Sequence, residues 1–248
     1  MMRSGLASEA APDAPLEALL SGALRHGLTA LELRAGDAHG ISGEVAARSG
    51  LVREAAQLAA ASRITIAGYR DTGRDDGGAL VQLSRQLGSL ILVDASTGLA
   101  ERLARASRLR AAGGSAAVIV RGTTAVEDAR AVARGGLDVA WEADPTLGPV
   151  GGTASQLLSE CREALTHVRL LGGGPESMMH EGRGLGELMA RLALSGFGGA
   201  VILAPSSRRF HVAWATWLGR RGGWGCGSKA SDATLVALGP PPAAGDAA

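Results

Sequence analysis

The chain has 248 residues, of which 46% are hydrophobic and 20% are charged, and its formal net charge is +1. This composition is ordinary for a globular protein, and the length suits one domain with a sizeable core. Because neither sign of charge is in excess, nothing indicates a nucleic-acid partner or an anionic membrane surface.

Helical and strand-like patterns alternate along the chain from Pro15 onward. Amphipathic helical periodicity covers residues 15–26, 44–62, 79–87, 99–112, 126–133, 153–165 and 185–194. A short apolar run follows each of them and predicts a strand buried on both faces; these runs are 30–33, 64–67, 90–94, 117–120, 138–141, 167–171 and 200–203. Glycine often stands just before the strand, where a preceding helix would end.

The regular alternation predicts an α/β fold, namely a (β/α)8-type TIM barrel, which typically needs roughly 250 residues. A doubly wound open sheet would also fit the order of elements, although no GxGxxG follows the first visible strand. Nothing before Pro15 resembles an eighth strand, so we expect a barrel that is incomplete or unusually closed at its N-terminal end. The predicted organisation is a flexible N-terminus (1–13), one barrel domain (14–238) and a flexible tail (239–248).

Cysteine use and hydropathy bear on the cellular location. Cys161 and Cys226 are the only cysteines, and they form neither a disulfide framework nor a zinc-ligand spacing. No N-terminal apolar run resembles a signal peptide, and no stretch reaches the ~18 apolar residues of a membrane span. Lys229 is the only lysine, as expected from a GC-rich bacterial genome. We therefore expect a bacterial, cytoplasmic protein.

Charged side chains stand at the predicted strand ends, and in a TIM barrel the functional site lies at the carboxyl ends of the strands. The strand ends carry Glu32, Arg34, Tyr69, Arg70, Asp94, Arg121, Glu142, Asp144 and Arg169. Arginine binds phosphate through its planar fork, and a carboxylate moves a proton next to a carbonyl. Such a set suits a small sugar or sugar phosphate, whereas the alternative is a set of ion pairs that hold the loops.

Four segments carry a resemblance to a known family. They are GLTALELR (27–34), LDVAWEADP (137–145), THVRLL (166–171) and GRGLGELMARLALSGFGGAVILAP (182–205). In this order and spacing they resemble segments of the xylose isomerase-like TIM barrels, which include sugar phosphate isomerases and epimerases. The resemblance implies a barrel, and in metal-dependent members a divalent ion such as Mn or Mg, held by a glutamate, an aspartate, a histidine and a second glutamate.

This chain departs from the family at the ligand positions. The residues aligned with the four ligands are Val120 or Arg121, then Glu142, then Arg169, then Ala204 or Pro205. Only Glu142 can bind a cation, since a guanidinium donates hydrogen bonds and accepts none. We therefore expect a degenerate metal site and no metal or other cofactor. Arg121 and Arg169 would either supply the positive field instead or form a structural network with Glu142.

Two further segments yield hypotheses. His180 and Arg183 belong to the loop GPESMMHEGRG after the strand at 167–171, and His180 is a candidate general acid or base. The alternative for His180 is an exposed loop residue. Residues 208–238 hold three of the four tryptophans, and Phe210, Trp214 and Trp217 share helical spacing. This Trp-rich segment would pack over the barrel or form a homodimer interface.

The sequence therefore favours, without deciding it, an isomerase or epimerase of a small sugar or sugar phosphate. It would move a proton next to a carbonyl without metal, and its partner would be a small polar molecule. The candidate catalytic residues are Glu142, Glu32 and His180, and the candidate substrate-binding residues are Arg34, Arg121, Arg169, Arg183, Asp144 and His167. The alternative is a catalytically inactive barrel, a pseudoenzyme, that serves as a ligand-binding or protein-interaction scaffold. A Schiff-base aldolase is disfavoured because no lysine stands at a strand end.

Overall fold

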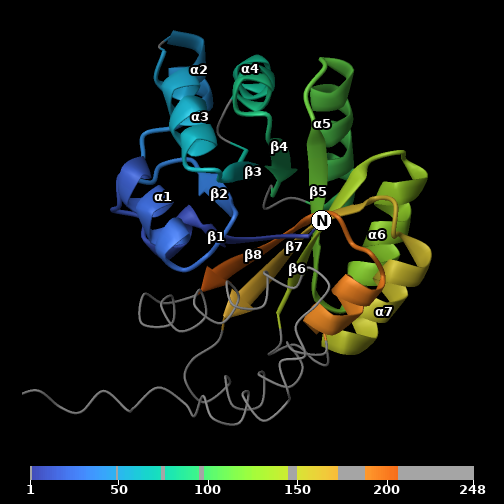
Figure 1. Ribbon diagram of the computed structural model, residues 1–248. Coiled ribbons are helices and arrows are strands. Elements are labelled where there is room, and N and C mark those ends of the chain that lie inside the picture. The colour runs from blue at the N-terminus through green and yellow to red at the C-terminus, as the bar shows by residue number, and fades with distance from the viewer. Residues whose placement is uncertain are drawn as a thin grey trace, which may run out of the picture.

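The computed structural model describes residues 2–48, 50–73, 76–94, 98–144, 150–172 and 188–205 (Figure 1). The Trp-rich segment and the predicted tail at 239–248 lie outside the described residues. Among the described helices, none combines the length and the apolar character needed to cross a membrane.

Parallel strands in sequential order close into a barrel. Within the described residues these are β1 (Arg3–Ala7), β2 (Ala30–Arg34), β3 (Thr65–Asp71), β4 (Leu90–Val93), β5 (Ala116–Arg121), β6 (Asp138–Ala143), β7 (Leu165–Gly172) and β8 (Ala200–Pro205). Each strand pairs in parallel with its neighbours in sequence, and β1 also pairs with β8, which closes the ring. The prediction of a (β/α)8-type barrel is confirmed.

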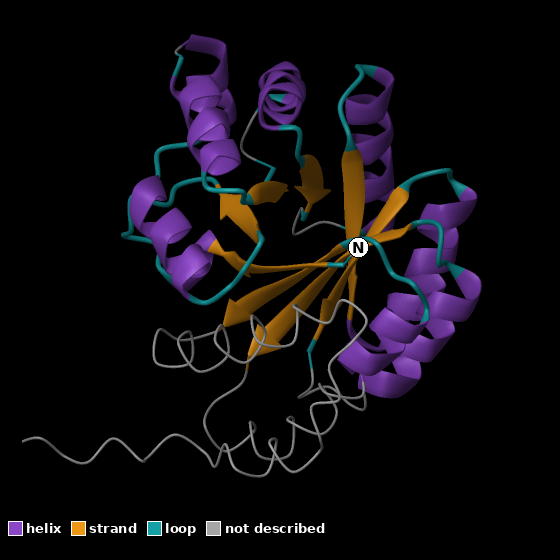
Figure 2. Ribbon diagram, in the orientation of Figure 1, coloured by secondary structure: helices purple, strands orange, loops and turns teal. Residues whose placement is uncertain are grey.

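Helices surround this ring on its outer side, as Figures 1 and 2 show. They are α1 (Leu16–Arg25), α2 (Gly43–Arg48), α3 (Leu51–Ala61), α4 (Gly77–Leu87), α5 (Leu99–Ala111), α6 (Ala125–Arg134) and α7 (Val150–Glu160), with short 3-10 helices η1 (Ser8–Ala10) and η2 (Gly122–Thr124). Residues 188–194 are also helical. The single helix predicted at 44–62 is two helices, and Gly50 caps the second of them. Glycine is a poor helix former, which is consistent with a break there.

The expectation of a barrel that is incomplete at its N-terminal end is wrong, because residues 3–10 of the predicted N-terminal stretch form a strand and a short 3-10 helix. The missing strand is β1, RSGLA, and its register places Gly5 beside both Ala30 and Ile202. The sequence pattern did not reveal it because none of these five residues is β-branched or aromatic, the types enriched in strands. Its stability comes from hydrogen bonding to neighbours on both sides. A Cβ on Gly5 would lie 2.5 Å from the Ala30 carbonyl oxygen, so glycine is needed for this close approach.

Alternate residues of each strand point into or out of the barrel. The outward set, including Ile91, Val118 and Val139, packs with the helices into the main hydrophobic core. The inward set forms two small clusters, one around Ala30 and Ile202 and one made of Leu92, Ala117, Ile119 and Ala140, with Leu90 packed against it. Many inward residues are therefore alanine, and this leaves room for long polar side chains nearer the carboxyl ends of the strands.

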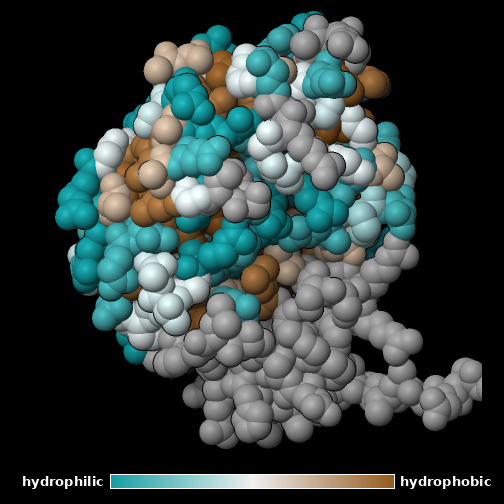
Figure 3. All heavy atoms as spheres, turned by 180° about the vertical axis from the view of Figure 1, so that it is seen from behind, coloured by the Kyte–Doolittle hydropathy of each residue, from teal (hydrophilic) through white to brown (hydrophobic). Residues whose placement is uncertain are grey.

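The surface shows no single large apolar face in the view of Figure 3, where hydrophobic residues are interspersed among hydrophilic ones. Among the described residues, the exposed large hydrophobic side chains are Leu24, Leu51 and Leu194, which stand on separate helices. Scattered apolar residues of this kind are usual on a folded surface.

Candidate functional site

The barrel mouth is the opening at the carboxyl ends of the strands. Its polar side chains point inward because each stands two positions after an inward residue of the same strand. Glu32 stands two residues after Ala30, Glu142 two after Ala140, and Arg169 two after His167. The strand register then makes Arg121, Glu142 and Arg169 direct neighbours across β5, β6 and β7. Because inward side chains at the carboxyl ends converge on one opening, residues far apart in sequence meet there.

Arg169 lies at the centre of this cluster and is fully buried. Its Nε donates to both oxygens of Glu32, at 2.8 and 3.1 Å. Its two terminal nitrogens donate to Glu142 and Glu9. Burial alone would lower the pKa of Arg169, but the negative charges of Glu32, Glu9 and Glu142 raise it. One guanidinium thus binds three carboxylates, from β2, β6 and η1. It does so with a planar, forked set of N–H donors that lysine lacks.

A second group of ion pairs lies nearer to solvent. Arg70 donates through Nε to Asp94 at 2.6 Å and through Nη1 to Glu9 at 2.8 Å. Arg121 pairs with Asp94 and lies 3.4 Å from Glu142. The side chain of Arg121 is 44% exposed, whereas that of Glu142 is 5% exposed. Arg121 is therefore the most accessible cation paired with Glu142.

Arg34 belongs to the rim of the same network. It donates to Asp37 through Nη2 at 2.7 Å and lies 3.4 Å from Glu9. The Ser8 hydroxyl donates to Asp37 at 2.6 Å and accepts the backbone N–H of Arg34 at 3.0 Å. These contacts tie the end of β1 to the end of β2, and they hold Glu9 where Arg34, Arg70 and Arg169 all reach it.

Glu32 and His167 form a buried pair beneath Arg169. The Nε2 atom of His167 lies 2.8 Å from Glu32, and both side chains are almost inaccessible to solvent. Because a carboxylate only accepts hydrogen bonds, Nε2 carries the proton in this contact. Burial alone would raise the pKa of Glu32, but the charge of Arg169 and the hydrogen bond from His167 outweigh it and lower that pKa to about 2. Glu32 is therefore ionised at neutral pH, and it is a weak base.

The structure brings together most of the residues that the sequence singled out. Glu32, Arg34, Arg121, Glu142, His167 and Arg169 all belong to one connected network. Asp144 lies just past the end of β6, at the edge of a pocket described below. His180 and Arg183 lie outside the described residues, so their predicted roles stay predictions.

Glu9 and Asp37 belong to this network but were not predicted from the sequence, and Arg70 and Asp94 were noted only as strand-end residues. Glu9 contacts three of the four arginines at the mouth. Its position was hidden because β1 itself was not recognised. Once β1 is known, the position of Glu9 two residues after its end places Glu9 at the carboxyl end of a strand, where the other polar residues of the network lie.

The divalent ion implied by the family resemblance does not fit these side chains. The guanidinium of Arg169 donates hydrogen bonds to Glu32 and Glu142 at once. A cation bound to those carboxylates would meet that positive charge at short range. Within the described residues, no group of three or more His, Cys, Asp or Glu side chains is arranged to hold a metal ion.

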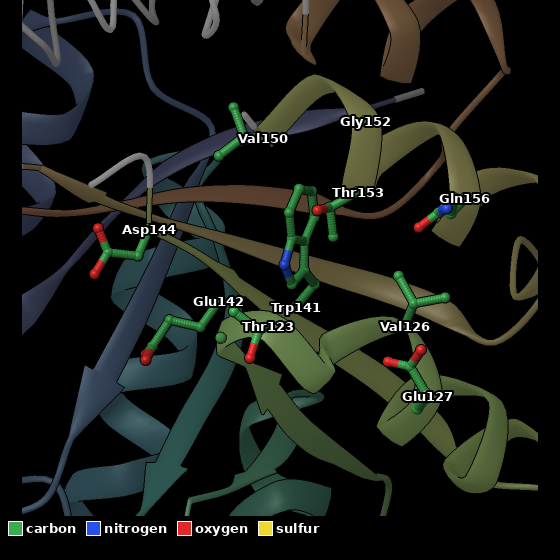
Figure 4. Close-up of a pocket in the computed structure, with 11 residues that line it drawn as sticks. Thr123, Val126, Glu127, Trp141, Glu142, Asp144, Val150, Gly152, Thr153 and Gln156 are labelled. Carbon is green, nitrogen blue, oxygen red and sulfur yellow. The ribbon is translucent and has the colours of Figure 1, made fainter. Parts of the chain in front are cut away.

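A pocket of about 400 Å³ opens beside this network, between the end of β6 and the first turns of α6 and α7 (Figure 4). The described residues that line it include Thr123 of η2, Glu127 in the first turn of α6, Trp141 and Glu142 of β6, and Thr153 of α7. In Figure 4 the Trp141 ring lies in the middle of the lining residues, with Glu142 and Asp144 to one side of it. Glu142 thus joins the buried ion-pair network to a space that can hold a small molecule.

Comparisons with known proteins support the fold. No protein-family model matches the chain, and no curated protein matches it by sequence. Solved structures do match. A D-psicose 3-epimerase from Clostridium cellulolyticum H10, solved with D-tagatose, has 15% identity and a TM-score of 0.54, and the match covers 89% of this chain and 96% of that one. A 3-keto-D-glucoside 4-epimerase from E. coli has 13% identity and a TM-score of 0.57, with 88% and 99% covered.

A third similar structure is a xylose isomerase domain-containing protein from Salmonella typhimurium LT2. It has 14% identity and a TM-score of 0.54, and the match covers 88% of this chain and 94% of that chain. These neighbours are xylose isomerase-like barrels, as the four sequence segments indicated. At such low identity the similarity establishes the architecture, while the chemistry must be argued from the side chains of this chain.

Proposed function

We propose that this protein is an isomerase or epimerase of a small sugar, which moves a proton next to a carbonyl without a divalent metal. The observation that carries the proposal is the position of Glu142. It accepts a hydrogen bond from the buried Arg169, it lies 3.4 Å from the half-exposed Arg121, and it lines the pocket. A carboxylate fixed on one side and facing a cavity on the other is placed to act on a bound molecule.

The chemistry follows from these neighbours. The Glu142 carboxylate takes the proton from the carbon next to the substrate carbonyl, and the electron pair of that C–H bond forms an enediolate. Arg121 is the cation beside Glu142 that offsets the developing negative charge on oxygen. Delivery of a proton to the opposite face of the same carbon by a second donor, such as water or the predicted acid His180, gives the epimer, and the proton on Glu142 then passes to solvent. Return of the proton from Glu142 to the neighbouring carbon, with a proton moving between the two oxygens through solvent, gives the isomer. Arg169 acts as a positioning residue, since it orients Glu142 from below.

Glu32 is less suited to this step than Glu142, although both were candidates. It is 1% exposed, and its pKa is lowered to about 2, so it accepts a proton poorly at neutral pH. We assign it, with His167, to holding Arg169 in place. His180, as an assisting acid, remains a prediction from the sequence.

The structural neighbours support the choice of substrate class. Two of them are epimerases of D-psicose and of a 3-keto-D-glucoside. Both names describe epimerisation of a sugar that carries a carbonyl. The proposed proton transfer is the same type of reaction, here with arginine in the position that the family resemblance gives to a metal ligand.

One observation favours the alternative of a catalytically inactive barrel. Each carboxylate of the network bonds at least one arginine, and Glu142 itself lies within 4 Å of three. These ion pairs occupy carboxylate oxygens that would otherwise be available to a substrate. In this alternative the network stabilises the barrel mouth, and the pocket binds a ligand without reaction.

A deuterium-exchange experiment distinguishes the proposed isomerase or epimerase from the catalytically inactive barrel. The purified protein is incubated in D2O with EDTA and with D-fructose, D-tagatose or D-psicose, and deuterium next to the carbonyl is measured by NMR. The wild type is expected to incorporate deuterium and to interconvert sugars, and Glu142→Gln is expected to lose at least ~100-fold of that rate, the usual size of a general-base contribution. Glu101→Gln, an exposed glutamate on α5, is the control. No exchange above the protein-free rate would favour the inactive barrel.

A further inference from the structure

We infer that the substrate site extends from Glu142 along α7, so that it selects a sugar by the length of its open carbon chain. The reacting carbons lie at Glu142, and the remaining hydroxyl-bearing carbons lie against Gly152, Thr153 and Gln156 of α7. This inference rests on the proposed function, because it names the class of substrate that the same site prefers, a six-carbon sugar over a four-carbon one.

The pocket is larger than the few atoms that take part in a proton transfer. Its volume is about 400 Å³, within the roughly 300–1,000 Å³ of small-molecule sites. In Figure 4 Glu142 and Gln156 lie on opposite sides of the Trp141 ring, so the β6 end and the α7 end of the pocket are separate. A ligand that contacts Glu142 alone would leave the α7 end to solvent.

The shape of the pocket suits the form of sugar that the chemistry requires. Removal of a proton next to a carbonyl needs the open-chain sugar, because the ring form has no free carbonyl. Gln156 follows Val150, the first residue of α7, by six positions, which is about 9 Å along the helix axis. Val150 and Gln156 both line the pocket, so its wall is long enough for a chain of several carbons.

The side chains of this wall suit the hydroxyl groups of such a chain. Thr153 and Gln156 stand three residues apart on one face of α7, and both offer neutral donors and acceptors. Glu127, in the first turn of α6, adds oxygens that accept hydrogen bonds from hydroxyls. Val126 and the Trp141 ring supply apolar surface for the C–H groups.

Gly152 is a further indication of a ligand at this wall. Glycine is a poor helix former, yet Gly152 is the third residue of α7. A Cβ on Gly152 would meet no described atom within 4 Å, so the packing of the described protein does not require glycine there. Gly152 is exposed and lines the pocket, and its missing side chain leaves room for the carbon chain of the sugar.

Binding of acyclic polyols tests the inference without any requirement for turnover, because these ligands stay open at every length. D-mannitol, with six carbons, is compared with erythritol, with four, by calorimetry and saturation-transfer NMR on the full chain. D-mannitol is expected to bind about tenfold more tightly, the effect of one or two additional hydrogen bonds. Gln156→Ala is expected to weaken binding of D-mannitol several-fold and to leave erythritol unchanged. Gln57→Ala, an exposed glutamine on α3, is expected to change neither.

A pair of glycine variants separates ligand binding from folding. Gly152→Ala and Gly22→Ala each place a methyl group on a helix glycine whose Cβ would meet no described atom within 4 Å. Both are expected to raise the denaturant midpoint, since alanine is the better helix former. Gly152→Ala is also expected to weaken binding of D-mannitol several-fold, whereas Gly22→Ala, far from the pocket in sequence and on α1, is expected to leave that binding unchanged.

The outcomes separate this inference from the proposed reaction. Equal binding of the two polyols, binding of neither, or a preference that persists in both Gln156→Ala and Gly152→Ala would overturn the inference. A preference for D-mannitol that these variants remove, without deuterium exchange of any ketose, would support the inference while contradicting the proposed proton transfer. Equal binding of the two polyols together with exchange of D-fructose would support the proton transfer and overturn the inference.

Discussion

The Nε of Arg169 bonds both oxygens of Glu32, at 2.8 and 3.1 Å, across 137 residues of sequence, and both side chains are almost completely buried. This contact joins β7 to β2, which β8 and β1 separate in the ring. Because the same guanidinium also bonds Glu142 and Glu9, it holds the end of β6 and the segment after β1 as well. One buried cation and its carboxylates therefore connect several elements across the mouth of the barrel.

Removal of Arg169 should destabilise the protein strongly. Arg169→Met leaves Glu32, Glu142 and Glu9 without this shared partner, and breaking a buried pair on one side typically costs about 3–5 kcal/mol. The free energy of unfolding of Arg169→Lys should lie between those of the wild type and Arg169→Met. Lysine keeps the positive charge but lacks the planar guanidinium. The measurement is the free energy of unfolding by urea. Arg130→Met, which removes an exposed partner of Glu160, is the control and should change little. Equal losses of unfolding free energy in Arg169→Met and Arg130→Met would contradict a special role for the buried network.

The stability should fall in acid in a way that depends on Glu32. Its pKa is about 2 in the folded protein against an ordinary value of 4.5, so the folded state binds this proton more weakly than the unfolded chain does. The stabilisation is complete above about pH 4.5 and is lost as the pH falls toward 2. It amounts to on the order of 3 kcal/mol. Urea unfolding between pH 7 and pH 2.5 should show a shallower decline for Glu32→Gln than for the wild type. Glu17→Gln, at an exposed site on α1, should follow the wild type.

Divalent metal should neither copurify with the protein nor stabilise it. Arg169 bonds the carboxylates that a cation would need, so Mn²⁺, Mg²⁺ or Zn²⁺ should leave the melting temperature unchanged, and EDTA should do the same. Elemental mass spectrometry of the purified chain gives the direct readout. About one equivalent of metal per chain, with a matching rise in melting temperature, would show that the mouth rearranges around an ion.

Two glycines of the N-terminal region should respond oppositely to alanine. At Gly5 a Cβ would lie 2.5 Å from the Ala30 carbonyl oxygen and 2.6 Å from Ile202, so Gly5→Ala should destabilise the barrel by about 1–3 kcal/mol. At Gly22, inside α1, a Cβ would meet nothing within 4 Å, and Gly22→Ala should stabilise by about 0.4–1 kcal/mol. Denaturant midpoints measure both. A neutral Gly5→Ala would mean that β1 is not held closely against β2 and β8.

The sequence by itself determined the class of fold and several of the residues that reach the mouth. Short apolar runs after amphipathic helices have the pattern of parallel strands buried on both faces, so β2 to β8 could be placed within a few residues. Because inward side chains alternate, Glu32, Glu142 and Arg169 could also be assigned to the strand ends. The four resembling segments pointed to the same kind of barrel as the structural neighbours.

Only the tertiary structure decided that the barrel is closed and which charges are paired. RSGLA becomes a strand because β2 and β8 offer hydrogen bonds on both sides, and no local preference reveals that. Glu9 reaches Arg169 across 160 residues of sequence for the same reason. The sequence pattern around a strand-end arginine is the same whether its side chain is free to bind a substrate or is paired with carboxylates. The difference depends on the register of other strands, which is a non-local property of the folded chain.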